Sequence, residues 1–362
     1  MSNSDIRVVP GPANYFSHPG SLERLSDFFS ADQLSRAVWV YGERALAGAE
    51  PFLPAAFHLP EAKKILFTGH CSERDVAALV QASGDDRAVV IGVGGGALLD
   101  SAKVLARRLG VPLVAIPTIA ATCAAWTPLS VWYSDAGQAL NFEIFDDANF
   151  LVLVEPRIIL NAPAEYLLAG IGDTLAKWYE AVVLAPQPTA LPLTVRLGIN
   201  GALAIRDVLL ASSETALADQ RRGDLTQAFR DVVEAIIAGG GMVGGLGERY
   251  TRVAAAHAVH NGLTVLPQTD KFLHGTKVAY GILVQSALLG QDDVLAQLVQ
   301  AYQRFNLPTT LAALEVDINN RAELDRVIAH TLRPGESIHY LPVTLTPEVL
   351  RAAFEKVEYF SR

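Results

Sequence analysis

The stretch AVVIGVGGGALLDSAKVLARRLGVPLVAIPT, residues 88–118, decides the fold. Its apolar runs predict a strand at 88–96 that leads into a glycine turn, and a second strand at 112–118. Between them, residues 97–110 predict a helix that is closed by Gly110. A strand, a helix and another strand in this order are typical of a parallel sheet whose strands are joined by crossover helices.

Other segments before residue 160 repeat this alternation, whereas later segments do not. We predict strands at 6–9, 37–41, 63–67 and 150–156, helices at 21–29 and 72–83, and a hairpin of 129–133 with 139–143. After about residue 160 the apolar residues recur with a period of 3.6, and almost no segment has the pattern of a strand. The sequence therefore predicts an α/β domain with a parallel sheet at 1–160, followed by an all-helical domain at 161–362.

Composition limits the classes of function. The chain has 362 residues, is 51% apolar and carries a formal net charge of −9, which argues against a nucleic-acid partner. Its two cysteines cannot form a disulfide framework, and such sparse use fits a reducing cytoplasm. The first residues lack the pattern of a signal peptide, and no apolar run reaches the roughly 18 residues that cross a bilayer. We therefore expect a soluble cytoplasmic protein without a membrane partner.

The glycine turn at 92–97, GVGGGA, satisfies the pattern G-x-G-x-x-A between a strand and a helix. Glycines let a phosphate approach the backbone, and the N-terminus of the following helix supplies N–H groups. As a dinucleotide fingerprint the match is weak, because no acidic residue follows about 20 positions later. A tight strand-to-helix turn is the alternative. Asp100 and Lys103, one helical turn apart, are either an ordinary surface ion pair or part of this crevice.

Three of the eight histidines lie between residues 251 and 275. His257 and His260 are three residues apart, so they share one face of a helix, and His274 begins the next apolar run. Asp173 lies in an apolar helix, where a carboxylate is costly unless it is paired or ligated. We predict that Asp173, His257 and His274 bind a divalent metal such as Zn²⁺ or Fe²⁺. A hydrogen-bonded core histidine and a helix-capping aspartate are the alternatives.

Several motifs together resemble the iron-dependent alcohol dehydrogenase superfamily in its glycerol dehydrogenase-like branch. They are GVGGGALLDSAK (92–103), PTIAATCAAWTPLSVWY (117–133), AGIGDTLAKWYEA (169–181), AAAHAVHNGL (254–263) and HGTKVAYG (274–281). The resemblance covers nearly the whole chain. It implies an α/β nucleotide-binding domain followed by an all-α metal-binding domain, an architecture that dehydroquinate synthase shares.

The resemblance also implies roles for individual residues. Asp173, His257 and His274 would be the metal ligands, and Lys177 stands where iron-dependent relatives have a fourth, histidine ligand, so zinc is favoured over iron. Glu43 matches the acidic residue that binds the adenosine ribose. The cofactor pyrophosphate would lie on Gly94, Gly95 and Gly96. The other expected cofactor-binding residues are Asp100, Thr118, Thr127, Leu129 and Tyr133.

Departures from glycerol dehydrogenase concern the substrate. Cys123 replaces the aspartate that contacts the polyol hydroxyls, and Arg249 and Arg252 lie just before His257. A site that loses an anion and gains cations near the metal suits a substrate that carries a carboxylate. The alternative is that both arginines are solvated helix residues without a role in substrate binding. The chain looks more similar to enterobacterial hydroxycarboxylate dehydrogenases, which implies reduction of small 2-oxo acids. NADP(H) is then favoured, and NAD(H) stays possible because Glu43 would repel a 2′-phosphate.

The expected chemistry is hydride transfer from the nicotinamide to a ketone carbon of the substrate. His260 is a candidate proton relay, and Cys123 and Arg252 are candidate substrate contacts. The alternatives are a glycerol or vicinal-diol dehydrogenase that uses NAD, an NAD-binding metal-dependent lyase or cyclase, and a non-catalytic nucleotide-binding relative. We also expect a homo-oligomer.

Overall fold

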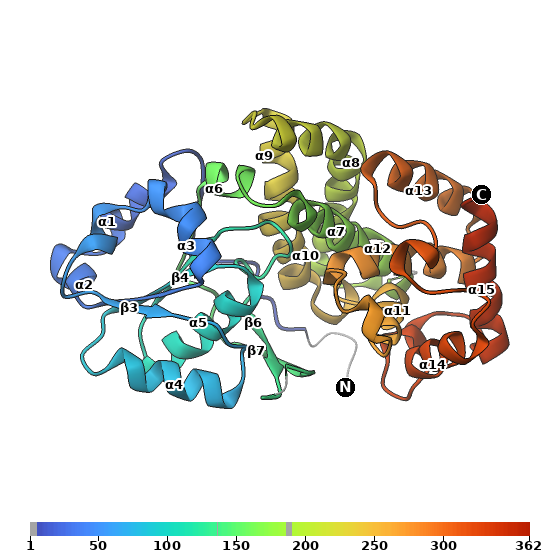
Figure 1. Cartoon of the computed structure of the whole chain (residues 1–362), viewed down its shortest axis with the longest axis horizontal. Helices are drawn as coiled ribbons and strands as arrows, with labels where there is room; N and C mark the ends of the chain where they lie inside the picture. Colours follow the sequence, from blue (N-terminus) through green and yellow to red (C-terminus); the bar gives the residue numbers. More distant parts are fainter. Residues whose placement is uncertain (1–5, 136, 186–189) are drawn as a thin grey trace. The chain divides into compact units, whose positions relative to one another are not determined.

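A computed structural model describes residues 6–135, 137–185 and 190–362 (Figure 1). The chain divides into two compact units. One unit comprises Val9–Pro163 with Asp219–Met242, and the other comprises Ala164–Ala218 with Val243–Arg362 and the N-terminal residues up to Val8. The first unit is an α/β structure and the second is helical, as the sequence predicts.

A six-stranded sheet forms the centre of the α/β unit. Its strands run in the order β1-β8-β5-β4-β2-β3, and every neighbouring pair is parallel. The strands are β1 (Asn14–Ser17), β2 (Ala37–Tyr41), β3 (Lys63–Leu66), β4 (Val89–Gly94), β5 (Leu113–Pro117) and β8 (Leu151–Val154). The sheet therefore confirms the parallel topology that the alternation of strands and helices predicts.

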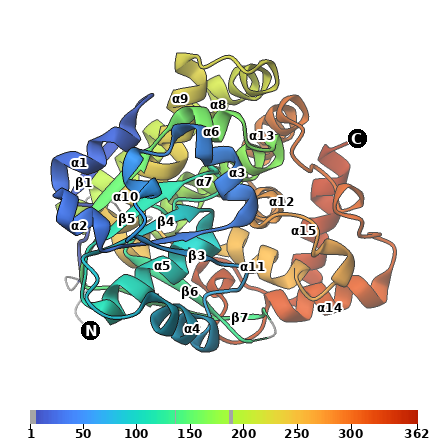
Figure 2. The same ribbon diagram turned by 60° about the vertical axis from the view of Figure 1, so that its left-hand side comes forward.

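Helices cover both faces of this sheet (Figures 1 and 2). Alternate strand residues such as Trp39, Ile91 and Ile116 point into a buried cluster with the short helices of one face. These are α1 (Leu25–Phe28), α2 (Ala31–Ser35), α3 (Glu43–Ala49) and α6 (Pro156–Leu160). On the other face lie α4 (Glu73–Ser83) and α5 (Gly96–Leu109). A Cβ on Gly92 would lie 2.9 Å from Ala102, so the missing side chain lets α5 pack closely on β4.

Two local features of the α/β unit concern its strands. The prediction of a strand at 6–9 is wrong, because the first strand is β1 at Asn14–Ser17, an edge strand beside β8. The predicted hairpin is present as the antiparallel pair β6 (Leu129–Tyr133) and β7 (Ala139–Ile144). Ala136 in its turn lies outside the described residues.

The helical unit contains no strand among its described residues. Its long helices are α7 (Ala164–Leu184), α8 (Leu193–Arg222), α10 (Gly240–Gly247), α11 (Ala255–Leu263), α12 (His274–Leu288), α13 (Asp292–Phe305), α14 (Arg321–Thr331) and α15 (Pro347–Phe360). α8 and α10 run across the division between the units, and α9 (Gln227–Glu234) belongs to the α/β unit. α12 is the centre of the helical unit, because it contacts α7, α11, α13 and α15.

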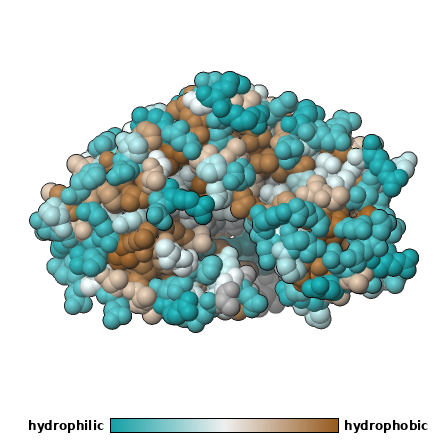
Figure 3. All heavy atoms as spheres, in the orientation of Figure 1, coloured by the Kyte–Doolittle hydropathy of each residue, from teal (hydrophilic) through white to brown (hydrophobic). Residues whose placement is uncertain are grey.

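In the part of the chain that the structure describes, no helix is both long enough and apolar enough to cross a membrane. Figure 3 shows one face of the molecule, where hydrophilic residues cover most of the surface and hydrophobic residues lie between them in smaller areas.

Candidate active site

Asp173, His257 and His274 come together in the helical unit. They lie on α7, in α11 and at the first residue of α12, and one potential ligand atom from each lies within 4.8 Å of the others. Nε2 of His274 is 3.3 Å from Oδ1 of Asp173, and Nε2 of His257 is 3.6 Å from the same oxygen. In a tetrahedral zinc site with bonds of about 2.0–2.1 Å, ligand atoms lie roughly 3.4 Å apart. Both distances from Asp173 are close to this value, and the three side chains together offer the donor set of a divalent metal site.

Glycines in α7 and α12 make this proximity possible. A Cβ on Gly172 would lie 2.4 Å from the carbonyl oxygen of Gly275, and a Cβ on Gly275 would lie 1.9 Å from the carbonyl oxygen of Ala169. Neither position has room for a side chain. Because Asp173 follows one glycine and His274 precedes the other, this close helix contact brings the two potential ligands together.

The electrostatics favour an ionised carboxylate. The side chain of Asp173 is only 8% exposed. Burial opposes its ionisation, but hydrogen bonds with His257 and His274 outweigh this effect and hold the pKa of Asp173 well below its usual range. Burial also lowers the pKa of His257, whereas the negative charges of Glu180 and Asp173 raise it, with a net rise to about 9. Without a metal, His257 is therefore mostly protonated at neutral pH.

Glu180 is a site residue that the sequence analysis missed. Its fully buried carboxylate accepts hydrogen bonds from the backbone N–H of Ala254 at 2.6 Å and of His257 at 3.1 Å. It also lies 2.7 Å from Nδ1 of His257. Glu180 follows Asp173 by seven residues, which is about two helical turns, so both carboxylates lie on one face of α7. That spacing in an apolar helix is the signal that could have identified it.

His260 lies beside the three potential ligands and contacts one of them. Its Nε2 is 3.0 Å from Nδ1 of His274, and its Nδ1 is 3.0 Å from Oδ1 of Asn261. Burial, together with the neighbouring His274, holds the pKa of His260 well below its usual range. His260 is therefore a neutral imidazole that acts on the site through His274.

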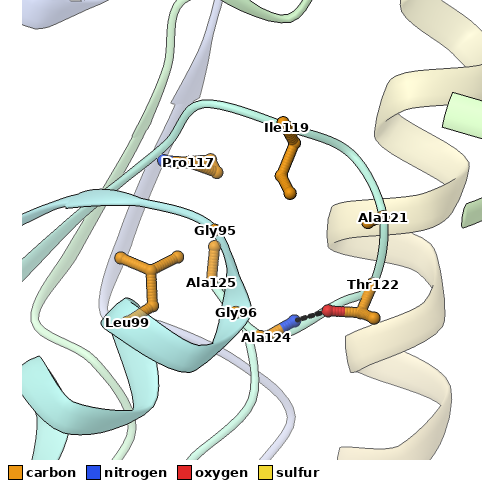
Figure 4. Close-up of a pocket in the computed structure, with 9 residues that line it drawn as sticks. All are labelled: Gly95, Gly96, Leu99, Pro117, Ile119, Ala121, Thr122, Ala124 and Ala125. Atoms are coloured by element: carbon orange, nitrogen blue, oxygen red, sulfur yellow. Dashed lines mark hydrogen bonds between the residues drawn. The ribbon is translucent and has the colours of Figure 1, made fainter. Parts of the chain in front are cut away.

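The glycine turn lies in the α/β unit, where β4 passes into α5. Gly94 ends β4, Gly95 precedes α5 and Gly96 is its first residue. The backbone N–H of Thr118, just after β5, donates to the carbonyl of Gly94 at 3.1 Å. Figure 4 shows the small pocket at these two strand ends, lined by Gly95, Gly96, Leu99, Pro117, Ile119, Ala121, Thr122, Ala124 and Ala125. Backbone and small side chains thus border the N-terminus of a 14-residue helix, a setting that suits an anion.

Asp100 and Lys103 form a buried ion pair rather than a surface pair. Nζ of Lys103 lies 2.8 Å from Asp100 and 2.5 Å from the carbonyl oxygen of Leu129. The other oxygen of Asp100 accepts the backbone N–H of Val131 at 3.0 Å. Burial raises the pKa of Asp100, and Lys103 only partly offsets that rise. The pair therefore connects α5 to β6, the strand that begins at Leu129 and ends at Tyr133.

The remaining predicted residues differ in exposure. Glu43 is the exposed first residue of α3. Four others are partly buried and lie along or before β6: Cys123, Thr127, Leu129 and Tyr133. Arg252 is partly buried just before α11, whereas Arg249 is exposed and forms an ion pair with Glu248 at 3.1 Å.

Comparison with known proteins identifies the family. A family described as "Iron-containing alcohol dehydrogenase" matches residues 12–156. The chain is also 80% identical to "Hydroxycarboxylate dehydrogenase A" of Escherichia coli (strain K12) over 360 residues, which are 99% of each chain. This chain belongs to the iron-containing alcohol dehydrogenase family. It is accordingly a dehydrogenase of that family, acting on CH–OH groups, and the resemblance that its motifs indicate is confirmed.

More distant members of the iron-containing alcohol dehydrogenase family agree with this assignment. The chain is 34% identical to "Glycerol dehydrogenase" of Pseudomonas putida, with 96% of each chain covered. The crystal structure of a probable glycerol dehydrogenase from Sinorhizobium meliloti 1021 matches with a TM-score of 0.85 at 29% identity, covering 98% of this chain and 99% of that chain. The α/β unit and the helical unit together therefore have the architecture of the glycerol dehydrogenase-like branch.

Proposed function

We propose that this chain is a metal- and NAD(P)H-dependent oxidoreductase that reduces small 2-oxo carboxylates to 2-hydroxy carboxylates. The observation that carries the proposal is the cluster of Asp173, His257 and His274 in a chain that is 80% identical to a hydroxycarboxylate dehydrogenase. Residues 1–160 would form the dinucleotide-binding domain, and residues 161–362 the metal-binding and catalytic domain.

The nucleotide would bind with its pyrophosphate at the N-terminus of α5. Backbone N–H groups of Gly95 and Gly96 would face the phosphates, and no side chain at these positions would block their approach. The rest of the nucleotide would contact residues on or near the strand ends, namely Gly94, Asp100, Thr118, Thr127, Leu129 and Tyr133. Asp100 would contribute indirectly, because both of its oxygens already accept hydrogen bonds inside the protein.

Asp173, His257 and His274 would hold the metal, through one carboxylate oxygen and two imidazole nitrogens. A bound divalent metal supplies Lewis-acid chemistry, which polarises a carbonyl and stabilises the developing alkoxide. A bound nicotinamide would supply the hydride that reduces the ketone carbon, and water would supply the proton that the resulting alkoxide oxygen takes up. His260 is the candidate relay for that proton, but both of its ring nitrogens are hydrogen-bonded, to Asn261 and to His274, so a positioning role through His274 suits it better.

The substrate carboxylate would be recognised by Arg252, whose guanidinium is suited to planar anions, and Cys123 would be a further substrate contact. NADP(H) is favoured, with Arg44 next to the acidic Glu43 as the candidate partner of a 2′-phosphate. Zinc is favoured over iron because Lys177 occupies the position of a fourth, histidine ligand. We also propose a homo-oligomer in the cytoplasm, with no nucleic-acid or membrane partner.

A glycerol or vicinal-diol dehydrogenase that uses NAD is the second candidate. It is supported by the relatives named glycerol dehydrogenase at 34% identity and by the matching crystal structure. Cys123 argues against it, because a thiol cannot replace a carboxylate that accepts hydrogen bonds from polyol hydroxyls. The lyase or cyclase and the non-catalytic relative have no support from the relatives named above, which are dehydrogenases.

An absorbance assay separates the two candidates. NADPH and NADH are each tested against a panel of 2-oxo acids, beside glycerol with NAD⁺ and NADP⁺. We expect turnover of 2-oxo acids and little oxidation of glycerol. Turnover of glycerol without turnover of any 2-oxo acid would refute the proposal.

Two variants test the assigned residues. His274→Ala should lose both bound metal and turnover, because it removes one of three ligands; full activity with unchanged metal content would contradict the site. Arg252→Ala should raise KM for a 2-oxo acid much more than for an uncharged ketone. Arg249→Ala is the matched control, since this exposed arginine lies three residues earlier. Equal effects of the two substitutions would remove Arg252 from the substrate site.

A further inference from the structure

We propose that two series of hydrogen bonds between side chains fix which ring nitrogen carries the hydrogen in His257 and in His274. We call them the first and the second hydrogen-bond chain; the first starts at Glu180 and the second at Glu336. Each hydrogen-bond chain leaves the lone pair on Nε2 of its histidine, the nitrogen that faces Asp173. Glu180, Asn261 and Glu336 are therefore positioning residues for the metal. The inference rests on the proposed metal site and adds residues to which the comparisons assign no role.

The first chain is a single step from Glu180 to His257. One oxygen of Glu180 accepts the backbone N–H groups of Ala254 and His257, and the other faces Nδ1 of the same histidine at 2.7 Å. An ionised carboxylate only accepts hydrogen bonds, so Nδ1 must carry the hydrogen. Nε2, which is 3.6 Å from Asp173, is then the nitrogen with the available lone pair once a metal replaces its proton.

The second chain begins at an ion pair near the surface. Arg333 donates from Nε to one oxygen of Glu336 at 2.7 Å, and Nδ2 of Asn261 donates to the other oxygen at 2.9 Å. The carboxylate therefore determines how the amide of Asn261 is turned, because only its NH₂ group can donate to Glu336. The amide oxygen of Asn261 must then face away from Glu336, toward His260.

The orientation of Asn261 sets the next two steps. Its oxygen lies 3.0 Å from Nδ1 of His260, so this nitrogen must carry the hydrogen and Nε2 of the neutral ring must accept. Nδ1 of His274, 3.0 Å from that Nε2, must therefore donate. With its hydrogen on Nδ1, His274 presents the lone pair of Nε2 to the site, 3.3 Å from Asp173.

Replacing either anchoring carboxylate by its amide should reverse the direction of these hydrogen bonds. In Glu336→Gln, Arg333 requires the amide oxygen, so the new NH₂ group faces Asn261. Asn261 then turns its own NH₂ group to His260, whose hydrogen moves to Nε2, and Nε2 of His274 becomes protonated.

Glu180→Gln has the same consequence for His257. The two backbone N–H groups require the amide oxygen, and the NH₂ group then faces Nδ1. The lone pair of His257 moves to Nδ1, and Nε2 carries the hydrogen where a metal would bind. Both substitutions preserve size, so the effect is one of hydrogen-bond direction rather than packing.

The test measures zinc affinity and the position of one hydrogen. Zinc affinity is determined by competition with a chromophoric chelator in the zinc-free full-length protein. The tautomer of His260 is read from nitrogen-15 NMR of histidine-labelled protein, with its signal identified by its loss in His260→Gln. Glu323→Gln is the matched control, because Glu323 also accepts a side-chain hydrogen bond, from Gln268 at 3.0 Å. Among the residues that the structure describes, no series of hydrogen bonds between side chains leads from Glu323 to Asp173, His257 or His274.

We expect zinc affinity to fall about 10–100-fold in Glu336→Gln and in Glu180→Gln, the range typical for partners of metal-binding histidines. Glu323→Gln should match the wild type. The hydrogen of His260 should be on Nδ1 in the wild type and on Nε2 in zinc-free Glu336→Gln. Unchanged zinc affinity in both variants, or a loss in Glu336→Gln while His260 keeps its hydrogen on Nδ1, would overturn the inference. A wild-type protein that binds no zinc would instead contradict the proposed function, and the tautomer of His260 would still test the second chain.

Discussion

The contact between α7 and α12 leads to a quantitative prediction for Gly275→Ala. The new Cβ would lie 1.9 Å from the carbonyl oxygen of Ala169 and 2.9 Å from Cβ of Asp173. Real Cβ atoms do not approach other atoms within 3.0 Å, so the helices must separate locally by roughly 1 Å. Metal–ligand distances tolerate deviations of only about 0.2 Å, and His274 is the residue before the substitution. The metal should therefore lose one of its three protein ligands.

The expected loss is at least about 100-fold in zinc affinity, because the disturbance exceeds that of a lost partner of a ligand. Overpacking should also destabilise the zinc-free protein by about 1–3 kcal/mol. Thermal unfolding is measured with and without zinc, beside the chelator competition. A metal at 100 times its Kd stabilises the wild type by about 2.7 kcal/mol, and Gly275→Ala should lose most of this increment.

Gly244→Ala is the matched control, because a Cβ added at this residue of α10 would meet no heavy atom within 4 Å apart from its chain neighbours and the backbone of its own helix. It should be neutral or stabilising by about 0.5–1 kcal/mol, as expected where glycine becomes alanine inside a helix. If Gly275→Ala bound zinc as tightly as Gly244→Ala, then the close helix contact would not be what positions the ligands.

Three further predictions follow from charges and burial. Lys103→Met should destabilise the protein by about 3–5 kcal/mol in urea unfolding, because the buried Asp100 loses its cation, and the double variant Asp100→Leu/Lys103→Met should recover most of the loss. Adding zinc to the metal-free protein near pH 7 should release about one proton per metal, because the pKa of His257 is raised to about 9. The proton is measured with a pH indicator in weak buffer, and its release should vanish as the pH rises past the pKa of His257. Cys71 should react with a thiol reagent only after unfolding, since burial raises its pKa to about 12.

The central strands of the sheet are predictable from the sequence because they are buried on both faces. The predicted strands at 37–41, 112–118 and 150–156 each contain a continuous apolar run, and the structure has strands at Ala37–Tyr41, Leu113–Pro117 and Leu151–Val154. The edge strand β1 has the sequence NYFS and is only half-buried, so it lacks such a run. Residues 6–9 have a strand-like composition but no partner strand, and strand formation depends on a partner.

The site residues also differ in whether the sequence near them or only their distant contacts in the fold could identify them. Asp173 and the histidines are identifiable because a carboxylate in an apolar helix and three histidines in a short segment are both unusual. Glu180 lies in WYEA, a sequence compatible with any helix, so its spacing from Asp173 is a weak signal, and its complete burial in the structure shows that it must have partners. Asn261 and Glu336 are 75 residues apart in the chain, so their hydrogen bond depends on how α11 packs against the turn after α14.

The same buried charges explain how the helical unit tolerates the site without a metal. Asp173 and Glu180 place two carboxylates on one face of α7, and an uncompensated pair would cost several kcal/mol. His257 touches both of them and holds a proton at neutral pH because of them. A divalent metal therefore replaces a proton between charged partners that are already in position. The zinc-free protein should accordingly stay folded, and zinc should add stability without being needed for folding. Cooperative thermal unfolding of the metal-free chain would support this conclusion, and the absence of any folded state before zinc is added would refute it.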